Sequence, residues 1–357
     1  MTSSPDIAVV GLGAATPIGR TALAAAAAVR AGISALAEHS FMVDSEGHPM
    51  RVAECPWLVE EANLAKRIVD CLLIAITGAI TEGLDTIRAA GPRATTNLFV
   101  NLPSRRPGLP PTLVREVRDG SRQKFSGTFG HVEVMERGHA GSFVGLSAAT
   151  KALRAGQAAA CVVVGADSYI HPDMLEWLES TDQLHGAGPR NNAWGFIPGE
   201  GAGALLLVRE DLAVRCGLPS WGMLGAVGVG RESKLIRTGT VCIGEGLTTA
   251  FKEALAALGP GEQVTDVYCD MNGEPYRADE YGFAVLRTRE RFVSATNFFA
   301  PADCWGDVGA ASGPLAILLA CVAGHKRYAT GGTNLIWGSS VDGDRGAALV
   351  RSLGRHS

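Results

Sequence analysis

Short, uninterrupted hydrophobic runs recur along the chain, and segments with the spacing of an amphipathic helix separate them. The two clearest runs are Cys161–Asp167, which reads CVVVGAD, and Ala202–Val208, which reads AGALLLV. Runs of this length without polar alternation are typical of strands that are covered on both faces. The segment Ser142–Ala155 precedes the first run and is followed by Gly156, which predicts a helix that ends at this glycine. The order helix, strand, long insertion, strand indicates an α/β protein.

The same pattern extends to both ends of the chain. Further strands are predicted over 7–12, 97–101 and 221–231, and further helices over 246–258 and 315–323. The strand that begins at Trp221 follows the end of the 202–208 run and starts the alternation again. We therefore expect two halves of similar construction, at about 1–210 and 211–357.

The first strand ends in a glycine-containing turn, Gly11–Gly19, that leads into an alanine-rich helix. Such a turn is also found where a dinucleotide binds. Thr16 stands where the third glycine of that fingerprint belongs, and two glycines after a strand are a weak signal. We interpret the segment as an ordinary strand-to-helix turn and expect no cofactor.

The amino-acid composition argues against several classes of function. The 357 residues carry 32 basic and 36 acidic side chains, and this balance argues against a nucleic-acid partner. No hydrophobic run approaches the roughly 20 residues of a membrane span, and no signal peptide is evident. The eight cysteines are scattered without a C-x-x-C pair, so neither a metal site nor a redox pair is suggested. A reducing cytoplasm is the expected location.

The segments ACVVVGADS, from Ala160, and GFIPGEGAGALLLV, from Gly195, occur in the order found in the β-ketoacyl synthases, the condensing enzymes of fatty-acid and polyketide synthesis. The opening VVGLGAATPIG, from Val9, also resembles that family. The resemblance implies the thiolase-like fold, which has five layers in the order αβαβα and two similar halves. It also implies a 3-oxoacyl-acyl-carrier-protein synthase-like protein.

The family's catalytic residues are replaced at the matching positions. The nucleophilic cysteine of the family lies at a strand-to-helix turn, where helix N-terminal amides stabilise a thiolate. Counting back from Arg154-Ala155-Gly156 places His139 there. The two catalytic histidines of the family correspond to Asn272 and to Asp307. Condensation needs a thiolate to form the acyl-enzyme, so the resemblance extends to the fold and leaves the activity doubtful.

The segment that closes the family's pocket also differs. In the family, a loop before the last strand gives backbone N–H groups to the oxyanion hole, and here that loop reads GSSVDGDRG, from Gly338. The resemblance implies that Ser340, Asp342 and Gly343 of this loop, together with Ser312, contact the substrate. A carboxylate such as Asp342 close to a developing oxyanion would oppose it.

Two interpretations of the replaced residues stay open. In the first, the protein has lost condensing activity and binds an acyl thioester or a partner, or serves only as a scaffold. In the second, it is an enzyme with altered acyl-transfer or acid–base chemistry, in which His139 is a general base that Asp307 orients. We rank the first above the second. Cys304 is the single cysteine near Asp307 in sequence, and we expect an idle, packed thiol.

The resemblance also implies partners. Family members pair through an edge strand of the first half, so a homodimer or a heterodimer with a ketosynthase-like subunit is expected. Acyl-carrier protein and acyl-coenzyme A are the expected ligands. The loop arginines Arg105 and Arg106 could meet an acidic carrier, although a solvated loop face is the preferred interpretation.

Overall fold

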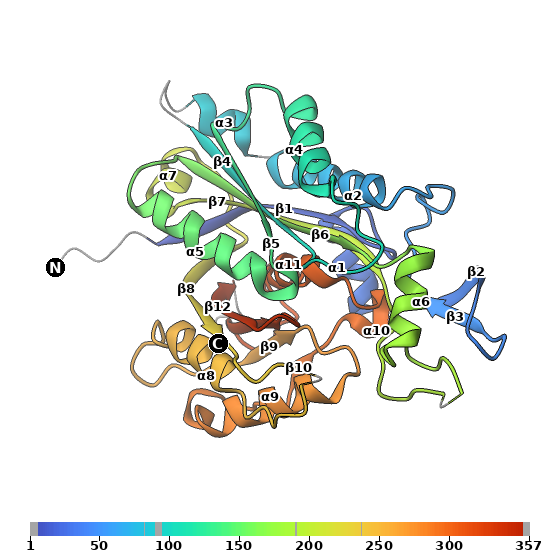
Figure 1. Cartoon of the computed structure of the whole chain (residues 1–357). Coiled ribbons are helices and arrows are strands. Elements are labelled where there is room, and N and C mark those ends of the chain that lie inside the picture. Colours follow the sequence, from blue (N-terminus) through green and yellow to red (C-terminus); the bar gives the residue numbers. More distant parts are fainter. Residues whose placement is uncertain (1–5, 82, 90–94, 190, 237, 353–357) are drawn as a thin grey trace.

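The computed structural model describes residues 6–81, 83–89, 95–189, 191–236 and 238–352. Among them, ten strands form a mixed sheet in the order β10-β9-β11-β12-β8-β1-β7-β6-β4-β5, and β2 (Ala37–Val43) and β3 (Pro49–Val52) form a separate hairpin. This is the mixed α/β architecture that the hydrophobic pattern predicts (Figure 1).

The ten strands fall into two sets of five that follow the chain. The first set consists of β1 (Ile7–Ala15), β4 (Thr96–Leu102), β5 (His131–Glu136), β6 (Ala160–Ser168) and β7 (Glu200–Arg209). The second set consists of β8 (Gly222–Arg231), β9 (Asp266–Cys269), β10 (Phe298–Phe299), β11 (Thr333–Ser339) and β12 (Asp344–Ser352). Only a short stretch of β1, Ile7–Val9, pairs with β8 and joins the sets. The division near residue 210 stays a prediction.

Three hydrophobic clusters lie between the layers and are shared by neighbouring layers. Residues of α5 (Gly141–Arg154) and α11 (Ser312–His325) share one buried cluster with residues from both sets of strands, so these helices lie in the middle. Outside the first set, α2 (Leu64–Ile80) contributes to a second cluster, with α3 (Leu84–Ala89) and α4 (Leu113–Lys124). Outside the second set, α8 (Glu245–Leu255) and α9 (Pro275–Leu286) build the third. The layers are therefore helix, sheet, helix, sheet, helix, as Figure 1 shows.

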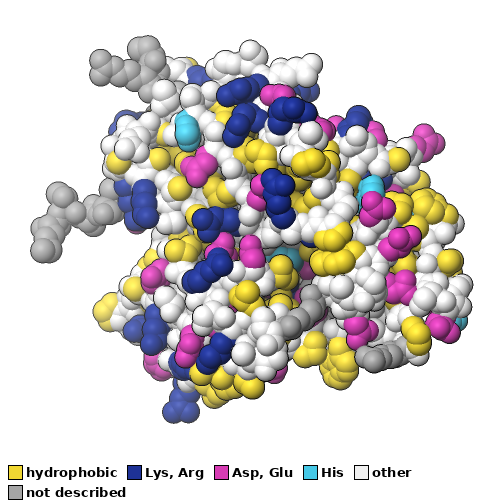
Figure 2. Space-filling model, viewed as in Figure 1, with side chains coloured by type: hydrophobic (Ala, Val, Ile, Leu, Met, Phe, Trp, Pro, Cys, Tyr) yellow, Lys and Arg dark blue, Asp and Glu magenta, His cyan; other side chains and the backbone are white. Residues whose placement is uncertain are grey.

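The remaining elements flank these layers. They are α1 (Ala22–Arg30), η1 (Gly138–Ala140), α6 (Pro172–Ser180), α7 (Glu210–Arg215), η2 (Arg289–Arg291), α10 (Ala302–Trp305) and η3 (Gly309–Ala311). Within the described residues, no helix is long and apolar enough to cross a membrane. Basic and acidic side chains are mixed over the face shown in Figure 2.

Glycines in the 195–203 segment allow the chain to approach the middle layer closely. A Cβ at Gly203 would lie 2.8 Å from the backbone nitrogen of Leu315, and one at Gly199 would lie 2.3 Å from the carbonyl oxygen of Trp305. Real Cβ atoms do not reach such distances, so glycine is required at both positions. This close backbone approach brings the loop after α10 against the start of β7.

Candidate active site

His139 lies at the junction between β5 and α5, in the short helical turn η1. The turn begins at Gly138, whose φ of 60° favours glycine, and its carbonyl accepts a hydrogen bond of 2.7 Å from the Asn101 side chain. His139 is 4% exposed, and the helix α5 begins two residues later. The sequence therefore places this imidazole at a helix N-terminus, inside the protein.

Asp307 lies in the loop between α10 and η3, and the glycine-rich segment before β7 holds it there. The Asp307 nitrogen donates to the carbonyl of Ile197 at 2.8 Å, and the Asp307 carbonyl accepts from the Gly199 nitrogen at 2.9 Å. Asn272 follows β9 in the second set of strands. The three candidate residues therefore come from three separate loops.

Their side chains meet. Nε2 of His139 lies 2.8 Å and 3.0 Å from the two carboxylate oxygens of Asp307, and Asn272 donates to the same carboxylate at 2.5 Å. The backbone nitrogen of Gly309 donates a further bond of 2.7 Å. The structure thus brings all three predicted positions together, and their catalytic role stays a prediction.

The carboxylate of Asp307 is held in its ionised form. Burial alone would raise the pKa of Asp307, but the His139 ring, the charge of Arg277 and the Gly309 amide together lower that pKa well below its ordinary value. An ionised carboxylate accepts hydrogen bonds only, so Nε2 of His139 carries the proton of the shared bond. The hydrogen bonds of the ring to described residues all use Nε2.

Arg277 is a site residue that the sequence analysis missed. It comes from the first turn of α9, is 1% exposed, and places Nη2 3.3 Å from Nε2 of His139. Its Nη1 donates to Asp270 at 2.6 Å and to the carbonyl of Ser339 at 2.9 Å, and its Nε donates to Glu274 at 3.4 Å. A proline at the first helical position signals the start of α9, but nothing in the pattern shows that this arginine points inward.

A cavity of about 200 Å³ opens onto these groups. Its polar floor contains His139, Asp307 and Arg277, while one wall consists of apolar side chains. Those wall residues are Tyr169, Trp177, Leu178 and Phe196. A small number of convergent polar groups against an apolar wall is the usual composition of a small-molecule site.

The two loop arginines at the mouth of this cavity differ. Arg105 is exposed, as expected of a solvated loop, and contacts Glu136 at 3.5 Å. The side chain of Arg106 is only 10% exposed, so the preferred interpretation of a solvated loop face is wrong for it. It pairs with Asp167 at 2.5 Å and lies 3.8 Å from the centre of the Tyr169 ring. It therefore anchors the loop to the end of β6.

The four predicted substrate-binding residues surround the site without forming its floor. Ser340 accepts a bond of 2.9 Å from the Ala140 nitrogen and donates to the Arg137 carbonyl at 2.5 Å. Asp342 accepts from Ser104 at 3.1 Å, and Gly343 has a φ of 103° in the same turn. Ser312 begins α11 and borders a separate cavity of about 10 Å³ behind Asp307. Their contact with a substrate stays a prediction.

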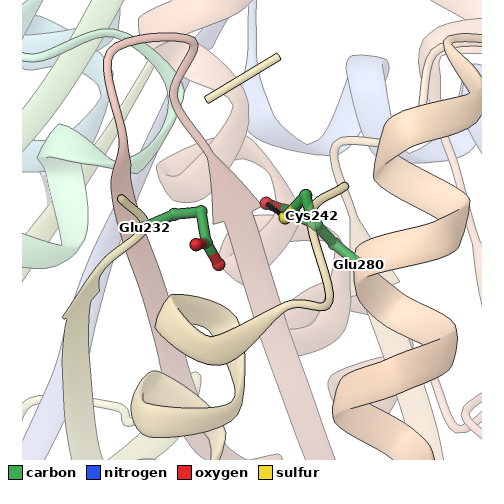
Figure 3. Close-up of side chains that lie close together, drawn as sticks. All are labelled: Glu232, Cys242 and Glu280. Atoms are coloured by element: carbon green, nitrogen blue, oxygen red, sulfur yellow. Dashed lines mark hydrogen bonds between the residues drawn. The ribbon is translucent and has the colours of Figure 1, made fainter. Parts of the chain in front are cut away.

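One cluster in the second half has the composition of a metal site. Glu232, Cys242 and Glu280 have potential ligand atoms within 4.8 Å of one another (Figure 3). Burial raises the pKa of Cys242 to about 12, which keeps the thiol protonated. Arg345 donates to both oxygens of Glu280 and would repel a cation. The cluster is better explained as a buried acidic group that an arginine neutralises.

The described residues that line the cavity of about 200 Å³ beside His139 include no cysteine. Cys304, the cysteine nearest to Asp307 in sequence, is 8% exposed and lines a different cavity of about 460 Å³, beside Phe299 and Tyr328. Burial raises the pKa of its thiol. The geometry agrees with a packed thiol that is not part of the site.

Comparison with known proteins gives the same assignment of fold. Residues 127–213 match the profile of the β-ketoacyl synthase N-terminal domain. No curated protein is similar enough in sequence to match. A type II polyketide synthase acyl-carrier protein in complex with its ketosynthase bound to the hexaketide (AntDE:AntF) contains a chain that is 14% identical, with a TM-score of 0.76 and coverage of 98% of this chain and 100% of that one.

Two further structures are similar to the same extent. The ishigamide ketosynthase/chain length factor has a TM-score of 0.76 at 14% identity, with 98% of this chain and 100% of that chain covered. A ketosynthase from module 6 of the bacillaene synthase from Bacillus subtilis 168 has a TM-score of 0.77 at 13% identity, with coverage of 97% and 72%. At these identities the likeness establishes the thiolase-like ketosynthase fold, as the sequence predicts.

Proposed function

We propose that this chain, a member of the β-ketoacyl synthase family by its matching profile and its fold, binds an acyl thioester without carrying out decarboxylative condensation. The observation that carries the proposal is the position of His139 at the start of α5, with its ring bonded to Asp307 at 2.8 Å. Decarboxylative condensation passes through a thioester on a cysteine thiolate. No cysteine among the described residues reaches this cavity.

The cavity itself supports retained binding. It keeps an apolar wall and a polar floor, and Ser340 fixes the loop before β12 against η1. Asp344, the second carboxylate of this loop, is paired with Arg137 at 3.0 Å and Arg231 at 2.7 Å. Its charge is therefore compensated on the outer side of the loop.

A paired arrangement is part of the proposal. Edge strand β5 pairs only with β4 among the described strands, so its outer edge is free for a second chain. The structures with similar folds include a ketosynthase/chain length factor and a complex with an acyl-carrier protein. We propose a homodimer, or a heterodimer with a ketosynthase-like subunit, and a carrier-linked acyl group as ligand.

The experiment combines two measurements on the full chain. Intact-protein mass spectrometry after incubation with acyl-coenzyme A and acyl-carrier protein is expected to show no covalent adduct. The tryptophan fluorescence of the chain is expected to change on binding, because Trp177 lines the cavity, and the change should be lost in Trp177→Phe. A stoichiometric adduct that disappears in Cys304→Ser would overturn the proposal. Absence of both adduct and binding would leave a scaffold that uses only its outer surface.

A further inference from the structure

We propose that the site hydrolyses short-chain acyl thioesters, with His139 as general base for water, Asp307 as its positioning residue and Arg277 as the cation that stabilises the oxyanion. This inference rests on the proposed function, because it requires the acyl thioester to occupy the cavity of about 200 Å³. It adds a reaction and a role for each polar group on the cavity floor.

The first argument is the state of the imidazole. Asp307 is ionised and accepts the Nε2–H of His139 at 2.8 Å, which fixes Nε2 as the ring nitrogen that carries a hydrogen. In the neutral ring Nδ1 therefore carries the lone pair, and His139 borders the cavity. A buried carboxylate that orients a histidine in this way is the arrangement that general bases use in hydrolases.

The second argument is the set of donors on Arg277. A guanidinium has five N–H groups. Nε donates to Glu274, and the two hydrogens of Nη1 are directed to Asp270 and to the Ser339 carbonyl. Among the described residues, the hydrogen-bonding contact of Nη2 is with Nε2 of His139 at 3.3 Å, and one Nη2 hydrogen points toward that ring. The second Nη2 hydrogen is left for a ligand.

The reaction follows from these positions. Water attacks the thioester carbonyl carbon, a C–O bond forms, and Nδ1 of His139 accepts a proton from the water. The carbonyl electron pair moves to oxygen, where the second Nη2 hydrogen of Arg277 stabilises the charge. The intermediate then collapses, the C–S bond breaks, and the sulfur leaves with its electron pair and takes the proton from Nδ1. The products are a carboxylic acid and a free thiol, and the enzyme returns to its initial state.

The volume and lining of the cavity define the substrate class. Tyr169, Trp177 and Phe196 form an apolar wall, and the ring centres of Tyr169 and Phe196 are 5.3 Å apart. This wall suits the tail of a short acyl chain, whereas its apolar side chains offer no cationic partner to a carboxylate at the end of the chain. We therefore expect butyryl-coenzyme A to be hydrolysed faster than malonyl-coenzyme A.

The test follows thiol release from butyryl-coenzyme A by the full chain. His139→Gln and Asp307→Asn are expected to lower kcat by about 10²–10⁴-fold, the usual contribution of a positioned base, with KM for Asp307→Asn within about twofold. Arg277→Lys keeps the charge but loses the planar donors, and it is expected to lower kcat by at least tenfold. The control is His48→Gln, because the side chain of His48 is exposed and does not line the cavity.

Binding is measured separately with a thioether analogue of butyryl-coenzyme A, which cannot be hydrolysed, as the change in tryptophan fluorescence that is lost in Trp177→Phe. Analogue binding without thiol release would overturn the hydrolytic activity and leave the proposed function standing. Absence of both would overturn both. Thiol release that is equal in His139→Gln and His48→Gln would show that this imidazole is not the base, and circular dichroism of each variant establishes that it is folded.

Discussion

Two buried ionic groups in this molecule use similar residues in different ways. In the first half, Glu200 accepts from Arg67 at 2.6 Å and 2.8 Å, from Ser168 at 2.9 Å and from the Cys55 nitrogen at 2.7 Å. Both oxygens are thus fully used. Glu200 and Arg67 are 0% and 2% exposed. This closed network joins α2 to the start of β7.

The group around His139 is open by comparison. Nη2 of Arg277 has no carboxylate partner among the described residues, and Oδ1 of the buried Asp270 has no hydrogen-bond partner there. Both groups lie next to a cavity rather than inside a packed layer. A closed set of buried charges stabilises the fold, whereas an open set next to a cavity is what a ligand site requires.

The largest expected effect is on the closed network. Arg67→Met should lower the free energy of unfolding by about 3–5 kcal/mol, because it leaves a buried carboxylate without its partner. Urea unfolding of the purified chain measures the difference.

The matched control is Lys66→Met, one position earlier on α2. Lys66 forms exposed ion pairs with Glu61 at 2.7 Å and Asp70 at 2.9 Å, and exposed pairs contribute little. The change in the free energy of unfolding for Lys66→Met should therefore lie near the error of the measurement. An equal loss in both variants would mean that burial of the Arg67 network adds nothing, and the contrast between closed and open groups would fail.

A smaller effect on stability is expected at the open group. Asp307→Asn should lower the free energy of unfolding at pH 7 by about 1–2 kcal/mol, the range for a hydrogen bond to a charged group. The loss is smaller than for Arg67→Met because asparagine keeps the shape of the side chain and an oxygen that can accept from Nε2 of His139.

The same variant has a defined pH dependence. The pKa of Asp307 lies below its ordinary 3.8, so its contribution is fully present above about pH 4 and is lost as pH falls through the native pKa. The difference between the wild-type chain and Asp307→Asn, followed by urea midpoints at pH 7, 5 and 3, should shrink below pH 4. A difference that grows as the pH falls would show that the carboxylate destabilises the native state.

Much of the fold could be predicted from the sequence because its strands are continuous and buried. The runs 161–167 and 202–208 became the central strands β6 and β7, and the helix predicted over 142–155 became α5. Gly199 and Gly203 stand in a glycine-rich segment of the sequence, and the close approach of the backbone there excludes every other side chain. Such features depend on local pattern and sterics, which a single sequence displays directly.

The site could be predicted only in part. Positions in a family pattern identified His139, Asn272 and Asp307. The inward orientation of Arg277 and Arg106 could not be predicted, because a single sequence does not show which distant residue an arginine pairs with. Asp167, the partner of Arg106, lies 61 residues away in sequence. Glu200 stands within the most recognisable motif, and its contacts with Arg67 and Ser168 are those of a structural residue.

The smallest expected effect concerns an ion pair near the surface that belongs to neither buried group. Glu262 receives bonds of 2.8 Å from both Nε and Nη2 of Arg351 on β12, and its side chain is 26% exposed. The hydrogen bonds from Arg351, opposed by partial burial, lower the pKa of Glu262 from 4.5 to about 2. Solvent screens such a pair, so Glu262→Gln should lower the free energy of unfolding at pH 7 by roughly 1 kcal/mol or less.

The pH and salt dependence of that variant separates it from the buried groups. Because the native pKa of Glu262 is lowered, its stabilisation is complete above about pH 4.5 and disappears as pH falls toward 2. Urea midpoints of the wild-type chain and of Glu262→Gln should therefore converge between these pH values, and also at 1 M salt, where the screening length is about 3 Å.

Arg67→Met should keep most of its loss of stability at 1 M salt, since buried pairs are screened much less. Equal salt sensitivity of both variants would mean that the Arg67 network is open to solvent, which contradicts the closed packing that distinguishes it from the site around His139.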